Sequence, residues 1–162
     1  MATVEVTFPP LPAHVRTARL VATAVARRSG MDESLLDEVR LAVGEACSRA
    51  VEAHRKHCPA EPIRVALCDD GERFEVVVTD AAPQDADGVP AQGISSAAAA
   101  PGGDGAAAGV APDAASDSGV ILQLPAGVGL AVITGLADDV RISPAGDGTS
   151  VSMSWKRRSV TA

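Results

Sequence analysis

The sequence contains no tyrosine, and aromatic residues make up only 2% of its 162 residues. Much of its 46% apolar fraction consists of alanine and other small side chains, so a hydrophobic core has to come from a minority of Val, Leu and Ile residues. The length favours one domain, and we expect residues 1–162 to form it.

Cysteines are few, and none of them forms a CxxC pair. Their number is odd, which argues against a disulfide framework and favours a reducing compartment such as the cytoplasm. His54, His57 and Cys58 lie close together in the sequence, but their spacing is irregular and a fourth ligand is not evident. We therefore predict no metal site there and interpret these residues as a polar helix end.

Two further features are missing: a long apolar run and an excess of positive charge. No stretch approaches about 18 consecutive apolar residues, and the N-terminus does not read as a secretory signal. We expect a cytoplasmic protein without membrane contact. A net charge of −7 argues against binding to nucleic acid. The one basic cluster, residues 156–158, is interpreted as a solvated tail.

What the sequence does contain is a long amphipathic helix over residues 31–57. Asp32 can cap its N-terminus, because the carboxylate accepts from the free N–H groups of the first turn. Apolar residues then recur at three- and four-residue spacing, from Leu35 to Val51, and predict one buried stripe. A stripe of this length needs a large surface to pack on.

Alternating segments elsewhere supply that surface. Strands are predicted from apolar alternation, helices from periodic spacing, and turns from Asp69-Asp70-Gly71 and Gly146-Asp147-Gly148. The resulting order is β-α-α-β-β-insertion-α-β-β, with the first strand at an edge. This order predicts an α+β fold, a two-layer α/β sandwich with a mixed, mostly antiparallel sheet and helices on one face. The predicted elements cover residues 3–8, 13–29, 31–57, 63–67, 74–79, 130–137, 140–142 and 151–155.

The composition changes between residues 81 and 124, where Ala, Gly, Pro, Ser and Asp dominate. Too few large apolar side chains are present to offset the entropy of ordering this stretch. Two interpretations remain open: a tolerated disordered insertion, and a mobile lid over a site.

Three short segments contain groups that could take part in binding or catalysis. Glu45 and Arg49 share a helix face, Asp80 ends a strand, and Gly127 and Gly129 open a helix whose N–H groups can hold phosphate. Each segment alone has an ordinary explanation: an i,i+4 ion pair, a turn residue and a helix start, respectively. Their order and spacing are more specific than any one of them.

In that order they resemble the GHKL (Bergerat-fold) ATPase superfamily, and within it the anti-sigma-factor serine kinases. VRLAVGEACSRAVEA resembles the N box, Thr79-Asp80 the start of the G1 box, and GVGLAVITGLADDVRI the G2 box. Gly148-Thr149 resembles the glycine–threonine step before the last strand. The resemblance covers about residues 1–80 and 120–156 and implies a Bergerat fold.

The resemblance also implies roles for particular residues. Glu45 matches the general base that positions the attacking hydroxyl, and Asp80 matches the aspartate that binds the adenine amine. The other nucleotide-binding positions that it implies are Arg49, Gly127, Gly129, Leu130 and Thr149.

Two positions depart from the family pattern. Arg49 stands where the family has the Mg²⁺-binding asparagine, and arginine has no lone pair to offer a cation. Ala81-Ala82-Pro83 replaces a glycine pattern that lets the backbone approach adenine. Arg49 could instead contact phosphate, or pair with Glu45 and occupy the base.

The implied partners are a sigma factor, an anti-anti-sigma protein of the STAS type, or both, and a second copy of the chain in a homodimer. The implied cofactor is ATP, while Arg49 argues against Mg²⁺. Two functions therefore stay open. The first is a partner-binding regulator with a degenerate nucleotide site. The alternative is an active ATP- and Mg²⁺-dependent serine kinase acting on a STAS antagonist.

Overall fold

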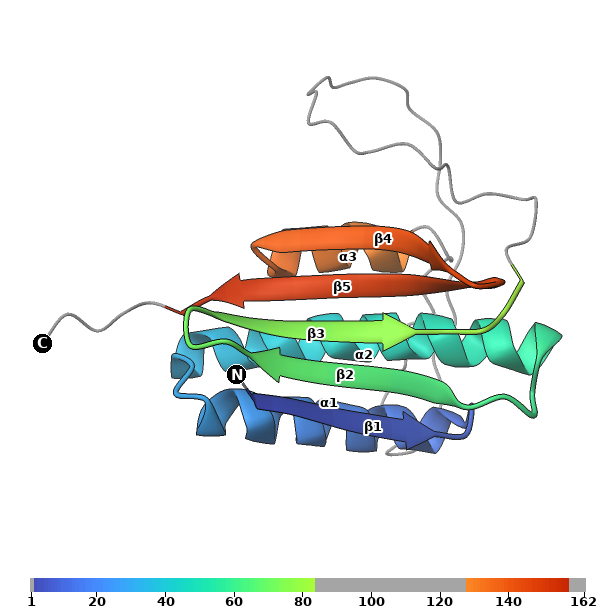
Figure 1. The fold of residues 1–162 in the computed structure, drawn as a ribbon, viewed down its shortest axis with the longest axis horizontal. Coiled ribbons are helices and arrows are strands. Elements are labelled where there is room, and N and C mark those ends of the chain that lie inside the picture. Colours follow the sequence, from blue (N-terminus) through green and yellow to red (C-terminus); the bar gives the residue numbers. More distant parts are fainter. Residues whose placement is uncertain (1, 84–127, 158–162) are drawn as a thin grey trace, which may run out of the picture. The chain divides into compact units, whose positions relative to one another are not determined.

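The computed structural model describes residues 2–83 and 128–157, which belong to one compact unit. Its architecture has two layers: a five-stranded sheet, and helices that all cover one face of that sheet (Figure 1). The strand order is β1-β2-β3-β5-β4, so the two halves of the sequence meet where β3 pairs with β5. The predicted two-layer α+β fold with helices on one face is confirmed.

Each strand pairs with its neighbours in antiparallel fashion, so the parallel component of the predicted mixed sheet is not found in the described residues. The first strand occupies an edge, as expected. The element order also matches the prediction. The strands are β1 (Ala2–Phe8), β2 (Ile63–Asp69), β3 (Arg73–Thr79), β4 (Asp139–Ala145) and β5 (Gly148–Lys156), and the helices are α1 (Pro12–Arg28), α2 (Glu33–His57) and α3 (Val128–Leu136).

Helix α2 begins at the predicted cap, where an oxygen of Asp32 accepts from the N–H of Ser34 at 2.9 Å. Its buried stripe is made mostly of small side chains, which lets α1 and the sheet approach closely. Gly44 shows how tight this contact is: a Cβ there would lie 2.1 Å from Nε of Arg19 on α1. The long helix therefore lies between α1 and α3 within the helix layer, as its central packing element.

All three aromatic side chains are buried. Phe74 and Trp155 face the helices from paired strands, with ring centroids 6.4 Å apart, and Phe8 adds a third ring at the end of β1. Because Trp155 is large and polar at one end, its Nε1–H needs a partner, and it donates to the carbonyl of Leu136 at 2.8 Å. All three aromatic side chains therefore contribute to the hydrophobic core.

The C-terminal basic cluster corrects one prediction. Lys156 belongs to β5, and Arg157 donates to the carbonyl of Gly71 at 3.2 Å and pairs with Asp69 at 3.5 Å. Arg157 therefore closes the turn between β2 and β3 and Lys156 extends β5, so these two residues are not a free tail. Arg158 lies outside the described residues.

The insertion predicted at residues 81–124 lies almost wholly outside the described residues, as do residues 125–127. Only residues 81–83 are described, and Ala82 is buried there. This first part is therefore packed and belongs with the preceding strand. None of the described helices has the length and apolar character needed to cross a membrane.

Candidate functional site

The centre of the candidate site is an ion pair between Arg49 and Asp80. Arg49 projects from the middle of α2, and Asp80 follows the last residue of β3. One guanidinium nitrogen, Nη1, lies 3.2 Å from Oδ2 of the carboxylate. The Asp80 side chain is only 4% exposed and that of Arg49 is 20% exposed, so solvent screens this pair far less than a surface pair.

The second oxygen of Asp80 is held by backbone groups. Oδ1 accepts from the N–H of Thr149 at 3.1 Å and from the N–H of Ala82 at 3.2 Å. The N–H of Asp80 itself donates to the carbonyl of Thr149 at 2.9 Å. The carboxylate thus joins α2, the end of β3 and the start of β5.

Gly148 makes this junction sterically feasible. A Cβ at this position would lie 1.9 Å from the carbonyl oxygen of Asp80, and 2.8 Å from Cα of Ala81. Real Cβ atoms do not approach backbone so closely, so any larger residue would push the two strand ends apart. Glycine is therefore needed at position 148, before Thr149, for steric reasons.

Glu45 lies one turn before Arg49 on α2, next to the start of α3. A Cβ on Gly129 would lie 3.4 Å from Oε2 of Glu45, and the neighbouring Leu130 is buried. Glu45 is half-buried and approaches the first turn of α3, where backbone N–H groups give a positive potential. The structure thus brings Glu45 beside Gly129, while Gly127 lies outside the described residues.

The proposed contact between Arg49 and Glu45 is not what the structure shows. Among the described residues, the ion-pair partner of Arg49 is Asp80, which lies 31 positions later in the chain. Helix periodicity relates only residues three or four positions apart, so it could not predict this partner. The two residues for which the resemblance implied the Mg²⁺-ligand and adenine-binding positions therefore contact each other.

His54 is a site residue that the sequence reasoning missed. It is fully buried, and its Nε2 accepts from the N–H of Ala81 at 2.8 Å while Nδ1 lies 2.9 Å from the carbonyl of Glu61. Both partners are backbone atoms, which leave no side-chain signal in the sequence. The interpretation of His54, His57 and Cys58 as a polar helix end therefore describes only the exposed His57.

Two of the three cysteines, Cys47 and Cys58, have thiols with a raised pKa. Burial raises the pKa of Cys47 to about 12, despite the nearby Arg19 guanidinium that lowers it. Desolvation, followed by the carboxylates of Glu61 and Asp80, raises the pKa of Cys58. Since the thiolate is the nucleophile, neither residue is suited to thiol chemistry near pH 7.

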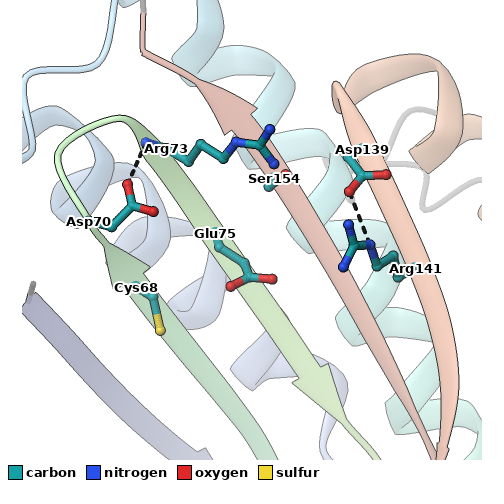
Figure 2. A pocket seen from close by; sticks show the side chains of 7 residues that line it. All are labelled: Cys68, Asp70, Arg73, Glu75, Asp139, Arg141 and Ser154. Carbon is teal, nitrogen blue, oxygen red and sulfur yellow. Dashed lines mark hydrogen bonds and ion pairs between the residues drawn. The ribbon is translucent and has the colours of Figure 1, made fainter.

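The opposite face of the sheet carries a separate polar hollow, shown in Figure 2. Its charges are largely satisfied locally: Arg141 pairs with Asp139 at 3.1 Å, and a carboxylate oxygen of Asp70 accepts from the N–H of Arg73 at 2.7 Å. None of the predicted site residues lines it, so it is distinct from the candidate site. The lining residues are Cys68, Asp70, Arg73, Glu75, Asp139, Arg141 and Ser154.

Within residues 2–83 and 128–157, no group of three or more His, Cys, Asp or Glu side chains is arranged to hold a metal ion. At the candidate site the three functional groups are a carboxylate, a guanidinium and a second carboxylate one helix turn away. Of these, Arg49 cannot ligate a cation, because it has donors only.

Comparison with known proteins agrees with this geometry. A search among curated proteins finds no significant match. One similar solved structure is that of the RsbU and RsbW domains of Rv1364c from Mycobacterium tuberculosis, with 18% identity and a TM-score of 0.62. The match covers 98% of this chain and 33% of that one, so this chain spans about a third of its length. At this identity the likeness establishes the fold.

The family model of the histidine kinase-like ATPase domain matches residues 8–155, from the end of β1 to the end of β5. That range includes the helix carrying Glu45 and Arg49, the strand end carrying Asp80, and the step at Thr149. Because the match extends over most of the chain and the topology is that of the fold, the protein belongs to the histidine kinase-like ATPase family.

Proposed function

We propose that this protein is a cytoplasmic regulator of the anti-sigma type, which binds a sigma factor, a STAS-type anti-anti-sigma protein, or both, while its own side chains occupy the nucleotide site. Two findings support the general class. The family is that of the histidine kinase-like ATPases, and the similar solved structure contains a domain named RsbW. A homodimer is part of the proposal.

The observation that carries the proposal is the Arg49–Asp80 pair. A carboxylate has about four acceptor positions, and three donors already use those of Asp80: Arg49, Thr149 and Ala82. An adenine amine would have to take the remaining position beside a guanidinium that already donates to the same oxygen. We infer that the Arg49 guanidinium takes the place that the adenine ring would occupy in an ATP-binding relative.

Magnesium fits this site even less well. Arg49 lies where the resemblance places the Mg²⁺ ligand, and it offers five N–H donors and no lone pair. Its positive charge also opposes a divalent cation in a partly buried site, where solvent screens weakly. The residues present therefore do not fit Mg²⁺·ATP held in the manner that the resemblance implies.

One observation favours the alternative, an active serine kinase that phosphorylates a STAS antagonist. Glu45 is half-buried next to Gly129 at the start of α3, which is the environment expected of a general base beside a phosphate-binding helix end. For this function, Arg49 would have to leave Asp80 and turn toward phosphate.

Calorimetric titration with ATP, with and without Mg²⁺, separates the two functions. We expect no binding heat from the natural protein and measurable binding from Arg49→Asn, which removes the guanidinium and restores a cation ligand. Arg40→Asn, an exposed arginine on the same helix, is the matched control and should behave like the natural protein. Mg²⁺-dependent binding by the natural protein, with phosphate transfer to a STAS protein, would establish the kinase instead.

The partner-binding part is tested separately by capture from a bacterial lysate treated with apyrase to remove nucleotide. We expect mass spectrometry to identify a sigma factor or a STAS protein in the captured material. Capture of neither, from a lysate in which both classes are detected, would contradict the proposal. Adding ATP should leave the captured amount unchanged, whereas a nucleotide-regulated kinase would show an ATP-dependent exchange of partners.

A further inference from the structure

His54 lies in the last turn of α2, five residues after Arg49, and is completely buried. The N–H of Ala81 donates to its Nε2 at 2.8 Å, and its Nδ1 lies 2.9 Å from the carbonyl oxygen of Glu61. An amide N–H can only donate, so Nε2 has to be the bare nitrogen. Nδ1 then carries the proton and donates to Glu61. The ring is therefore held as one defined neutral tautomer.

The two hydrogen bonds connect segments that are far apart in sequence. One bond fixes the connection that leads from α2 into β2, and the other fixes the residue directly after Asp80. Together with the bond from the N–H of Asp80 to the carbonyl of Thr149, the backbone is held on both sides of the carboxylate. Helix α2 thus holds this strand end twice, through the Asp80 side chain by Arg49 and through the Ala81 backbone by His54.

We infer that His54 is the positioning residue of the candidate site: through Ala81, it sets the place of the Asp80 carboxylate opposite Arg49, and protonation of its Nε2 releases that hold. A proton on Nε2 would turn the acceptor into a donor that faces the Ala81 N–H. The inference concerns the same site as the proposed function, but it rests on hydrogen bonds that are measurable without any ligand.

Several ionisable groups surround this ring. Asp80 lies beside it on the strand end, and Cys58 and Glu61 lie on the connection after α2, where the N–H of Cys58 donates to the carbonyl of His54. On α2, Arg49 pairs with Asp80, and His57 follows His54 by three positions at the helix end. Any pH response assigned to His54 has to be separated from these groups, and ring signals of His54 itself provide that separation.

The first test is nitrogen-15 NMR of the full chain. We expect a scalar coupling across the hydrogen bond between the Ala81 amide nitrogen and His54 Nε2, which only this tautomer produces. On acidification the coupling should disappear with the same midpoint as the His54 ring signals, while the protection factor of the Ala81 amide, taken relative to the intrinsic exchange rate at each pH, falls at least about tenfold. His57→Gln should leave both observations unchanged. A proton on Nε2 at neutral pH, or an Ala81 amide indifferent to the His54 titration, would overturn the inference.

The second test compares His54→Leu with His54→Gln. Leucine fills the space without either hydrogen bond, whereas a glutamine amide can accept from Ala81 and donate to Glu61. We expect His54→Leu to speed exchange of the Arg49 guanidinium protons by about tenfold, because the carboxylate is no longer held in place, and His54→Gln to recover most of the natural rate. Equal rates in all three folded proteins would contradict a positioning role.

The natural protein and His54→Gln keep the inference testable should His54→Leu fail to fold, since the coupling and its pH dependence need no apolar variant. Failure of the two proposals is also distinguishable. ATP binding by the natural protein would contradict the occupied nucleotide site and leave the His54 bonds unaffected, whereas loss of the His54 coupling would leave the Arg49–Asp80 argument intact.

Discussion

The two ends of the β2–β3 hairpin carry the same pair of residue types in different surroundings. Asp69 ends β2 and pairs with Arg157 at 3.5 Å, while Asp80 follows β3 and pairs with Arg49 at 3.2 Å. Because the strands run antiparallel, these pairs lie at opposite ends of the sheet. The Asp69 side chain is 18% exposed and that of Asp80 is 4% exposed.

This difference in burial changes what each pair does. At the turn, the carboxylate of Asp69 accepts from the N–H of Gly71 at 2.9 Å, and solvent can replace Arg157 if the pair opens. At the site, the carboxylate depends on protein donors alone, so removing it would leave a guanidinium and two N–H groups without a partner. The turn pair is therefore dispensable, and the site pair is a fixed part of the structure.

Exchanging each aspartate for alanine tests this contrast most strongly. Asp80→Ala should lower the free energy of unfolding by about 3–5 kcal/mol, because it strands a partly buried charge and two backbone donors. Asp69→Ala should cost about 1 kcal/mol. Urea unfolding followed by fluorescence of Trp155, the single and buried tryptophan, measures both. Equal losses would show that burial does not separate the two pairs.

Substitution of glycine extends the comparison to the backbone. Gly148→Ala should cost about 2–3 kcal/mol, because the new Cβ would collide with the carbonyl of Asp80 and force the strand ends apart. Gly135→Ala in α3 meets open space and should leave stability unchanged or raise it by up to about 1 kcal/mol, because alanine favours the helix. The same unfolding assay applies, and a tolerated alanine at 148 would contradict the close approach.

The pH dependence of stability tests the carboxylates at the turn. The N–H of Gly71, as the largest cause, lowers the pKa of Asp69, and the N–H groups of Arg73 and Glu72 lower that of Asp70. A lowered folded-state pKa contributes stability above the unfolded value, about 3.9, which is lost as the pH falls through the folded value. The double variant Asp69→Asn with Asp70→Asn should therefore lose less stability than the natural protein between about pH 5 and pH 2. If both proteins lose the same stability over this pH range, these two carboxylates are not the cause of the loss.

The last comparison concerns a cysteine in the core and a cysteine on the open face of the sheet. Cys47 is buried with a pKa of about 12, whereas Cys68 is partly exposed on the open face of the sheet. A thiol reagent at pH 8 should label Cys68 at least about a hundredfold faster than Cys47, which reacts only when the core opens. Peptide mass spectrometry reads each site, and comparable rates would mean that the helix layer opens more easily than its packing suggests.

The fold was largely readable from the sequence because hydrophobic periodicity reports which face of an element is buried. The stripe from Leu35 to Val51 predicted α2, and Asp32 marked its start correctly. Periodicity does not report which strands become neighbours across a long insertion. The pairing of β3 with β5, which makes the sheet continuous and antiparallel, is set by contacts between residues more than 70 positions apart.

The candidate site could be predicted only in part, because sequence periodicity does not report contacts between distant segments. Family resemblance pointed to Arg49, Asp80 and Thr149, and the structure brings these three together. Their pairing was not predicted, since a helix argument offers Arg49 only neighbours such as Glu45. The sequence analysis gave His54 no role in the site, because its partners are backbone atoms of Ala81 and Glu61, and backbone contacts do not depend on residue type.

The direct ladder between β3 and β5 has a consequence for how this chain can change over time. The described part of the sheet is formed without any residue between 84 and 127: β3 ends at Thr79, the description resumes at α3, and β5 pairs directly with β3. Closing a loop becomes costlier only with the logarithm of its length, about 0.6 kcal/mol for each doubling. A change in the length of the segment 84–127 is therefore expected to cost little stability, because the β3–β5 ladder and the Asp80 junction are built from residues outside it.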